Sequence, residues 1–116
     1  MNALISGSTG LIGSAFLEKY GSVFEHVFTI GRKASKNSNH FFYDFSKPET
    51  ITFPEKIDVF FHFASQTSID GANQDIENDL RTNVSGFVHL LEIFRDLGMR
   101  PVIIIASTAT QVGYTN

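Results

Sequence analysis

The sequence predicts an α/β fold in which helices cover both faces of a parallel β-sheet. Short apolar segments alternate with segments of helical spacing along the 116-residue chain. The apolar segments lack the polar alternation of a half-exposed strand, which is typical of strands that are covered on both faces. A glycine-rich turn connects the first apolar segment to the first helical one. Together these observations indicate a doubly wound sheet with three layers, helix–sheet–helix.

Composition narrows the possible classes of protein. A hydrophobic content of 42% and a charged content of 18% indicate one folded domain over residues 1–116. The net charge of −3 argues against a general affinity for nucleic acid or membrane surfaces. The sequence has no cysteine, which excludes disulfides and cysteine nucleophiles, and its histidines do not cluster with carboxylates, so we expect no metal site. We also expect a cytoplasmic location, because no stretch is apolar enough to span a bilayer and no signal peptide is evident.

The most informative stretch is at the start of the chain. Residues 3–5 predict a buried strand, and a helix is expected over residues 11–20. Between them Gly7, Gly10 and Gly13 recur at three-residue spacing, an arrangement that presents backbone N–H groups at the positive end of a helix to a phosphate. Gly7 should allow a tight turn, Gly10 the approach of a pyrophosphate, and Gly13 close packing of the helix on the sheet. The alternative is an ordinary glycine-rich turn that binds nothing.

The remaining elements follow in order along the chain. Strands are expected at residues 26–31, 40–45, 57–64 and 102–106, and a long helix at residues 74–97. The first helix should bury Ile12, Ala15, Phe16 and Tyr20. The long helix should bury the stripe Ile76, Leu80, Val84, Phe87, Val88, Leu91 and Phe94. On the fourth strand, His62 is expected to be a hydrogen-bonded core residue.

The predicted topology brings separate segments to one edge of the sheet. Right-handed crossovers, with a reversal after the first strand, give the strand order 3-2-1-4-5. In such sheets ligands bind at the carboxyl ends of the strands, beside the reversal. The residues expected at those ends are Gly7 to Gly13, Arg32, Asp44, Ala64 and Ser107.

Five short motifs occur in a characteristic order: Gly7-Ser-Thr-Gly-Leu-Ile-Gly13, Tyr43-Asp-Phe45, Phe61-His-Phe-Ala-Ser65, Asn83-Val-Ser-Gly86 and Ser107-Thr-Ala-Thr-Gln-Val-Gly113. Over the whole chain they resemble the extended short-chain dehydrogenase/reductase family, which contains NAD(P)-dependent sugar-nucleotide epimerases and dehydratases. The resemblance implies a Rossmann-type NAD(P)-binding domain, cut short at its C-terminal end and without the substrate-binding part.

The same resemblance implies a set of cofactor-binding residues. It implies that the carboxylate of Asp44 accepts a hydrogen bond from the adenine amino group of the cofactor. The full set is Gly7, Ser8, Thr9, Gly10, Leu11, Ile12, Gly13, Arg32, Lys33, Asp44, Phe45, Phe63, Ala64, Ser65 and Asn83. An Asn in mid-helix also favours a specific hydrogen bond at Asn83, because asparagine is a weak helix former. Arg32 and Lys33 replace the carboxylate that usually binds the ribose of NAD, so the sequence favours NADP, with NAD possible.

The catalytic part of the family's pattern is incomplete. Thr108, with Ser107 beside it, matches the residue that binds the substrate oxygen. No Tyr-x-x-x-Lys pair follows the fifth strand before Asn116, and Tyr114 has no lysine after it. We therefore expect a chain that is not catalytic by itself.

Two other functions stay open: a non-catalytic module that binds or senses a nucleotide, and an interaction scaffold. The strand at 102–106 is apolar and lies at a sheet edge, and the long helix is apolar over a broad arc. A homo-oligomer through that strand, the helix at 74–97, or both, is therefore expected.

Overall fold

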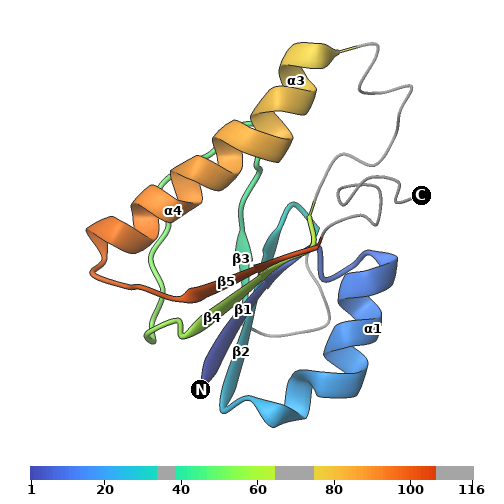
Figure 1. The fold of residues 1–116 in the computed structure, drawn as a ribbon, viewed down its shortest axis with the longest axis vertical. Helices are drawn as coiled ribbons and strands as arrows, with labels where there is room; N and C mark the ends of the chain where they lie inside the picture. The colour runs from blue at the N-terminus through green and yellow to red at the C-terminus, as the bar shows by residue number, and fades with distance from the viewer. Residues whose placement is uncertain (34–38, 65–74, 107–116) are drawn as a thin grey trace, which may run out of the picture.

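The structure of the protein is a computed structural model, which describes residues 1–33, 39–64 and 75–106. Its centre is a parallel sheet with the strand order β3-β2-β1-β4-β5, which confirms the order predicted from the sequence (Figure 1). The strands are β1 (Asn2–Ser6), β2 (His26–Gly31), β3 (His40–Phe42), β4 (Val59–His62) and β5 (Val102–Ile105). In this register Leu4 of β1 lies between Phe28 of β2 and Phe60 of β4.

Helices cover both faces of the sheet. Helix α1 (Leu11–Tyr20) and the 3₁₀ turn η1 (Gly21–Val23) lie on one side. On the other side runs one long helical segment, made of α3 (Ile76–Leu80), a π-helical turn η2 (Arg81–Ser85) and α4 (Gly86–Asp96) (Figure 1). The three-layer arrangement expected from the sequence is therefore confirmed.

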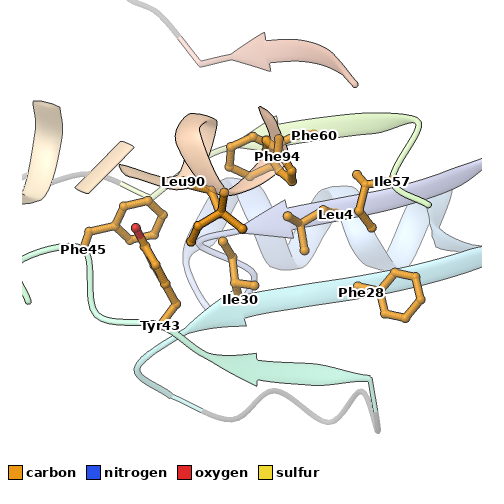
Figure 2. Close-up of a cluster of buried hydrophobic side chains, with 10 residues drawn as sticks. Leu4, Phe28, Ile30, Tyr43, Phe45, Ile57, Phe60, Leu90 and Phe94 are labelled. Carbon is orange, nitrogen blue, oxygen red and sulfur yellow. The ribbon is translucent and has the colours of Figure 1, made fainter. Parts of the chain in front are cut away.

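The side chains on the two faces of the central strands belong to two separate hydrophobic cores. Leu4, Ile30 and Phe60 point toward α4, where Leu90 and Phe94 pack on them (Figure 2). The alternate residues Ala3, Ile5, Val59 and Phe61 point the other way and pack against Phe16 and Leu17 of α1. Burial of each large side chain of this kind stabilises the fold by about 1.5–3 kcal/mol. Because both faces are covered, the strands need apolar residues at every position, which explains their continuous apolar sequences.

Two expected strands are shorter than predicted by several residues, and the fifth, Val102–Ile105, ends one residue early. The third ends at Phe42 instead of residue 45, because the chain leaves the sheet after Tyr43 N–H donates to the Gly31 carbonyl at 3.2 Å. Residues 43–45 then pack against α4 instead of β2, and both Tyr43 and Phe45 belong to the core on that side (Figure 2). The fourth strand covers Val59–His62 instead of residues 57–64.

The expected buried faces of the helices were partly wrong. In α1 the face toward the sheet carries Gly13, Phe16 and Leu17, whereas Ile12, Ala15 and Tyr20 are exposed. In the long segment the buried residues are Gly86, Leu90, Ile93 and Phe94. The residues Ile76, Leu80, Val84 and Val88 form an exposed apolar row, called here the outer row. Both helices have apolar residues on more than one face, so periodicity alone does not determine which face meets the sheet.

Candidate nucleotide-binding pocket

A pocket of about 600 Å³ lies at the carboxyl ends of β1, β2 and β4. Thirteen residues proposed from the sequence line it: Gly7, Ser8, Thr9, Gly10, Leu11, Ile12, Gly13, Arg32, Lys33, Asp44, Phe45, Phe63 and Ala64. Its other lining residues are Ile30, Gly31, Tyr43, Ser46, Asn78 and Thr82. Ser65, Ser107 and Thr108 lie outside the described residues. The structure therefore brings five separated segments of the chain to one concave surface.

The first wall of the pocket is the glycine turn between β1 and α1. Gly7 has φ +71°, a left-handed conformation that glycine adopts at no steric cost. A Cβ atom on Gly7 would also lie 2.8 Å from the backbone N of Ala64, so the turn rests directly on the end of β4. Gly7 thus allows the tight turn that the sequence predicts. Gly13 permits a close approach as well, but its neighbour is the Gly7 carbonyl within the turn and not the sheet.

Within the described part of the chain, backbone donors at the start of α1 have no protein hydrogen-bond partner. Gly10 N–H donates to the Gly7 carbonyl at 3.1 Å, and no side chain among the described residues caps the helix. The N–H groups of Leu11, Ile12 and Gly13 precede the first possible intrahelical acceptor, and all three residues line the pocket. These groups lie at the positive end of the helix dipole, which suits a phosphate oxygen. A protruding side chain at residue 10 would occupy this surface, and the glycine leaves it open.

Behind the turn, Ser6 ties the ends of β1 and β4 together. Its Oγ accepts hydrogen bonds from the N–H groups of Phe63 and Ala64, both at 3.2 Å. With its lone pairs so engaged, the hydroxyl donates to Nδ1 of His62 at 2.7 Å. His62 is therefore neutral with its proton on Nε2, and burial lowers its pKa to about 4. Its ring lies among Phe45, Phe60 and Phe87, as expected of a hydrogen-bonded core histidine.

Residues 43–45, which follow β3, pack closely against the long helix. The Tyr43 hydroxyl donates to the Gly86 carbonyl at 2.7 Å, and burial raises the pKa of this phenol. The Cα of Gly86 approaches the backbone of Phe45 so closely that a Cβ atom would overlap it. This contact explains the glycine of the Asn83-Val-Ser-Gly86 motif, and it fixes the neighbouring Asp44 in the pocket wall. Sequence reasoning missed the role of Tyr43, whose partner lies 43 residues away.

Residues 43–47 also have the spacing Tyr-x-x-x-Lys. They do not lie on a helix, and the Tyr43 side chain is 1% exposed with its hydroxyl engaged by Gly86. A general acid/base must reach the proton that it transfers, and this phenol has no access to a substrate. The pair therefore does not replace the catalytic pair that the family resemblance expects after the fifth strand.

Asp44 lies in the pocket wall with one carboxylate oxygen already bonded. Its Oδ1 accepts from Ser46 N–H at 2.9 Å and from the Ser46 hydroxyl at 2.6 Å. Burial raises the pKa of Asp44, but the Ser46 hydroxyl, the Ser46 N–H and the nearby charges of Arg32 and Lys47 outweigh it, and the pKa lies below its ordinary value. The group is thus an ionised acceptor at neutral pH.

Two cations stand at the rim of the pocket. Arg32 and Lys33 follow β2, and both are exposed. Neither forms an ion pair with another side chain in the part of the chain that the structure describes. Both charges are therefore available to an anionic ligand.

Two side chains of the long helical segment reach the pocket. Asn78 and Thr82 line it, one helical turn apart, and sequence reasoning had singled out neither. Asn83 is absent from the lining; its Nδ2 donates to Asp79 Oδ1 at 2.9 Å, which is the kind of specific hydrogen bond expected for a mid-helix asparagine.

Among residues 1–33, 39–64 and 75–106, no three His, Asp or Glu side chains are close enough together to hold a metal ion. Within the same residues, no helix has both the length and the apolar character needed to cross a bilayer.

The pocket lies beside the strand-order reversal of a doubly wound sheet, and a glycine turn forms one of its walls. This combination is characteristic of nucleotide-binding α/β domains. The chain belongs to the NAD dependent epimerase/dehydratase family, whose model matches residues 3–116.

Solved structures with the same fold include a UDP-glucose 4-epimerase (TM-score 0.75, 21% identity) and MoeE5 in complex with UDP-glucuronic acid and NAD (TM-score 0.75, 19% identity). RMD from Pseudomonas aeruginosa, complexed with NADPH, is also similar (TM-score 0.73, 19% identity). Each comparison covers 100% of this chain but only 38%, 40% and 38%, respectively, of the other protein. The chain thus spans about two fifths of the length of the proteins it resembles.

Proposed function

We propose that this chain binds NADP in the pocket at the strand ends and forms the cofactor-binding part of an epimerase or dehydratase. The observation that carries the proposal is the uncapped start of α1, with the amides of Leu11, Ile12 and Gly13 in the pocket wall. These amides would hold the pyrophosphate, and Asp44 and Phe45 would contact the adenine. When bound, the nicotinamide supplies hydride transfer. The residues described here contribute binding and orientation.

The glycine turn offers a test that separates folding from binding. Gly10 has φ −78°, and of the residues that the structure describes a Cβ atom there would meet only the Gly7 carbonyl, at 3.4 Å, so Gly10→Ala should fold. The added methyl group would occupy the surface assigned to the pyrophosphate. We expect NADP affinity to fall by roughly tenfold or more, since a lost charge-assisted hydrogen bond costs about 1.5–3 kcal/mol. Gly21→Ala, at the opposite end of α1, is the matched control and should bind as the wild type does. Equal affinities of all three proteins in calorimetric titrations would refute the proposed site.

The preference for NADP over NAD depends on Arg32 and Lys33. Two exposed cations without side-chain ion-pair partners in the described structure support a 2′-phosphate site. A double Arg32→Gln/Lys33→Gln variant should lose roughly tenfold or more in NADP affinity and much less in NAD affinity. Tighter binding of NAD than NADP by the wild-type protein would overturn this preference.

We further propose that the 116-residue chain is a binding module and does not catalyse hydride transfer alone. The buried, engaged Tyr43 supports this, because it is unsuited to act as the general acid/base. Absorbance at 340 nm of the chain with NADPH or NADP and nucleotide sugars should not change. Turnover that survives removal of trace contaminants would contradict the proposal. A nucleotide sensor without any catalytic partner is the alternative, and it predicts the same binding.

A second copy of the chain is the partner that we propose for the exposed apolar surfaces. Val102, Ile104 and Ile105 of the edge strand β5 are exposed, and so is the outer row of the long helix. An apolar edge strand readily pairs with another chain. Light scattering should therefore show a dimer or larger oligomer at micromolar concentration, and Ile104→Lys should shift it toward monomer. A monodisperse wild-type monomer would contradict this proposal.

A further inference from the structure

Strand β5 lies at the end of the sheet, and its outer edge carries backbone groups that face away from β4. Among the described residues β5 pairs with β4 alone. The N–H groups of Val102 and Ala106 donate to carbonyls of the β4 segment at 2.9 and 3.2 Å. Backbone groups alternate in direction along a strand, so the N–H and C=O groups of Ile103 and Ile105 point away from β4. The edge therefore offers hydrogen-bond donors and acceptors to another strand.

The side chains of β5 lack the features that usually protect a sheet edge from pairing. All of them are apolar and β-branched, whereas protected edges carry lysine, proline or a bulge. Val102, Ile104 and Ile105 are 61%, 43% and 54% exposed. The register places Val102 and Ile104 beside Val59 and Phe61, on the side of the sheet that faces α1. Both the backbone edge and one side-chain face of β5 are thus open within the described structure.

We propose that two copies of the chain pair through β5 in antiparallel orientation, about a two-fold axis at Ile104, and form one continuous sheet. The inference rests on the homo-oligomer proposed above, and it assigns the contact to this edge instead of to the outer row. A two-fold axis perpendicular to the sheet brings identical edges together and closes the assembly at a dimer. The partial charges along the edge are then self-complementary, because each outward N–H meets a carbonyl of the other copy.

An axis at Ile104 is the register that pairs every outward group within Val102–Ile105 itself. Ile103 of one copy lies opposite Ile105 of the other, and these residues exchange both backbone hydrogen bonds. An axis at Ile103 would bring Ile105 opposite Pro101, which has no N–H to donate. With the axis at Ile104, the two Ile104 residues form a pair without backbone hydrogen bonds, and their Cα atoms lie about 4.5 Å apart. Their side chains then cover each other on the exposed face.

Single cysteines test this geometry without background, because the chain has no cysteine of its own. A Cα separation of about 4.5 Å is within the range that a disulfide spans. Under mild oxidation Ile104→Cys should therefore form a covalent dimer, detected by non-reducing electrophoresis. Val102→Cys is the matched control, on the same strand and the same face and more exposed. It lies opposite Ala106 of the other copy, so its two cysteines are about 13 Å apart and should give little or no covalent dimer.

The Ile105→Pro variant adds a readout that does not depend on a thiol. Proline removes the outward N–H of residue 105 and leaves the hydrogen bonds to β4 in place, and edge strands tolerate proline at such positions. By symmetry each dimer loses two hydrogen bonds. The dissociation constant of the dimer, measured by analytical ultracentrifugation, should rise roughly tenfold or more, while the far-UV circular dichroism stays that of the wild type.

The possible outcomes separate this inference from the proposed oligomer. Val88→Cys, in the outer row, reports the competing interface. If the wild type is a monomer, the proposed oligomer fails and this inference fails with it. If Val88→Cys cross-links and Ile104→Cys does not, the inference is overturned but the oligomer stands. Equal cross-linking of Ile104→Cys and Val102→Cys, or an unchanged dissociation constant for folded Ile105→Pro, also overturns the inference.

Discussion

Lowering the pH should destabilise this protein through His62. The ring is buried between aromatic side chains and is neutral, with Nδ1 accepting from the Ser6 hydroxyl at 2.7 Å. Burial alone lowers its pKa from 6.5 to about 4. The unfolded chain therefore binds a proton at this residue at a higher pH than the folded chain does. Stability that is present above pH 6.5 is lost as the pH falls, and the loss levels off below about pH 4.

The size of this effect follows from the two pKa values. Between pH 7.5 and pH 5 the difference in proton binding at His62 lowers the free energy of unfolding by about 2 kcal/mol. That amount is a large fraction of the stability of a small domain, which is about 5–15 kcal/mol. The other histidines and the carboxylates also change the free energy of unfolding between these pH values, and a control variant is needed to subtract their contribution.

Urea unfolding followed by far-UV circular dichroism suits a chain without tryptophan. The measurement is made at pH 7.5 and pH 5.0, at equal ionic strength, for the wild type and for His62→Asn. Asparagine places an uncharged acceptor near the position of Nδ1, so it keeps a partner for Ser6 but does not titrate. Any constant loss from the smaller side chain cancels, because each protein is compared with itself. The wild type should lose about 2 kcal/mol more than the variant on acidification. Equal losses in the two proteins would refute the assignment of a buried neutral histidine.

Further substitutions test the contacts that support the pocket. Gly86→Ala should lower the free energy of unfolding by about 3 kcal/mol or more, because its Cβ would overlap the Phe45 backbone. Gly98→Ala, where no described residue lies within 4 Å, should cost about 1 kcal/mol from its φ of +71°, and equal costs would contradict the close packing at Gly86. Tyr43→Phe should lower the free energy of unfolding by about 1 kcal/mol through loss of the bond to Gly86, and an unchanged midpoint would show that this bond contributes nothing. Gly13→Ala should prevent the start of α1 from packing on Gly7, so helical circular dichroism and NADP binding should fall together; a variant that retains both would show that this approach is not needed.

Local patterns were sufficient for much of the fold. Strand order, helix α1 and the place of the glycine turn followed from continuous apolar segments, glycine spacing and the handedness of crossovers. These features depend on residues close together in the sequence or on general chain geometry. Which face of each helix is buried did not follow, because Ile12 and the outer row are as apolar as the residues that meet the sheet.

By itself, the sequence determined that a parallel sheet carries a glycine turn at its reversal and that candidate ligand-binding side chains gather beside it. Only the tertiary structure decided how those side chains are held: Tyr43 and Phe45 on Gly86, His62 on Ser6, and Asn78 and Thr82 in the pocket in place of Asn83. The physical reason is the range of the interactions. Apolar periodicity and turn formation are properties of a short segment, whereas these contacts join residues some 40 to 56 positions apart or depend on which side of the long helix faces the sheet.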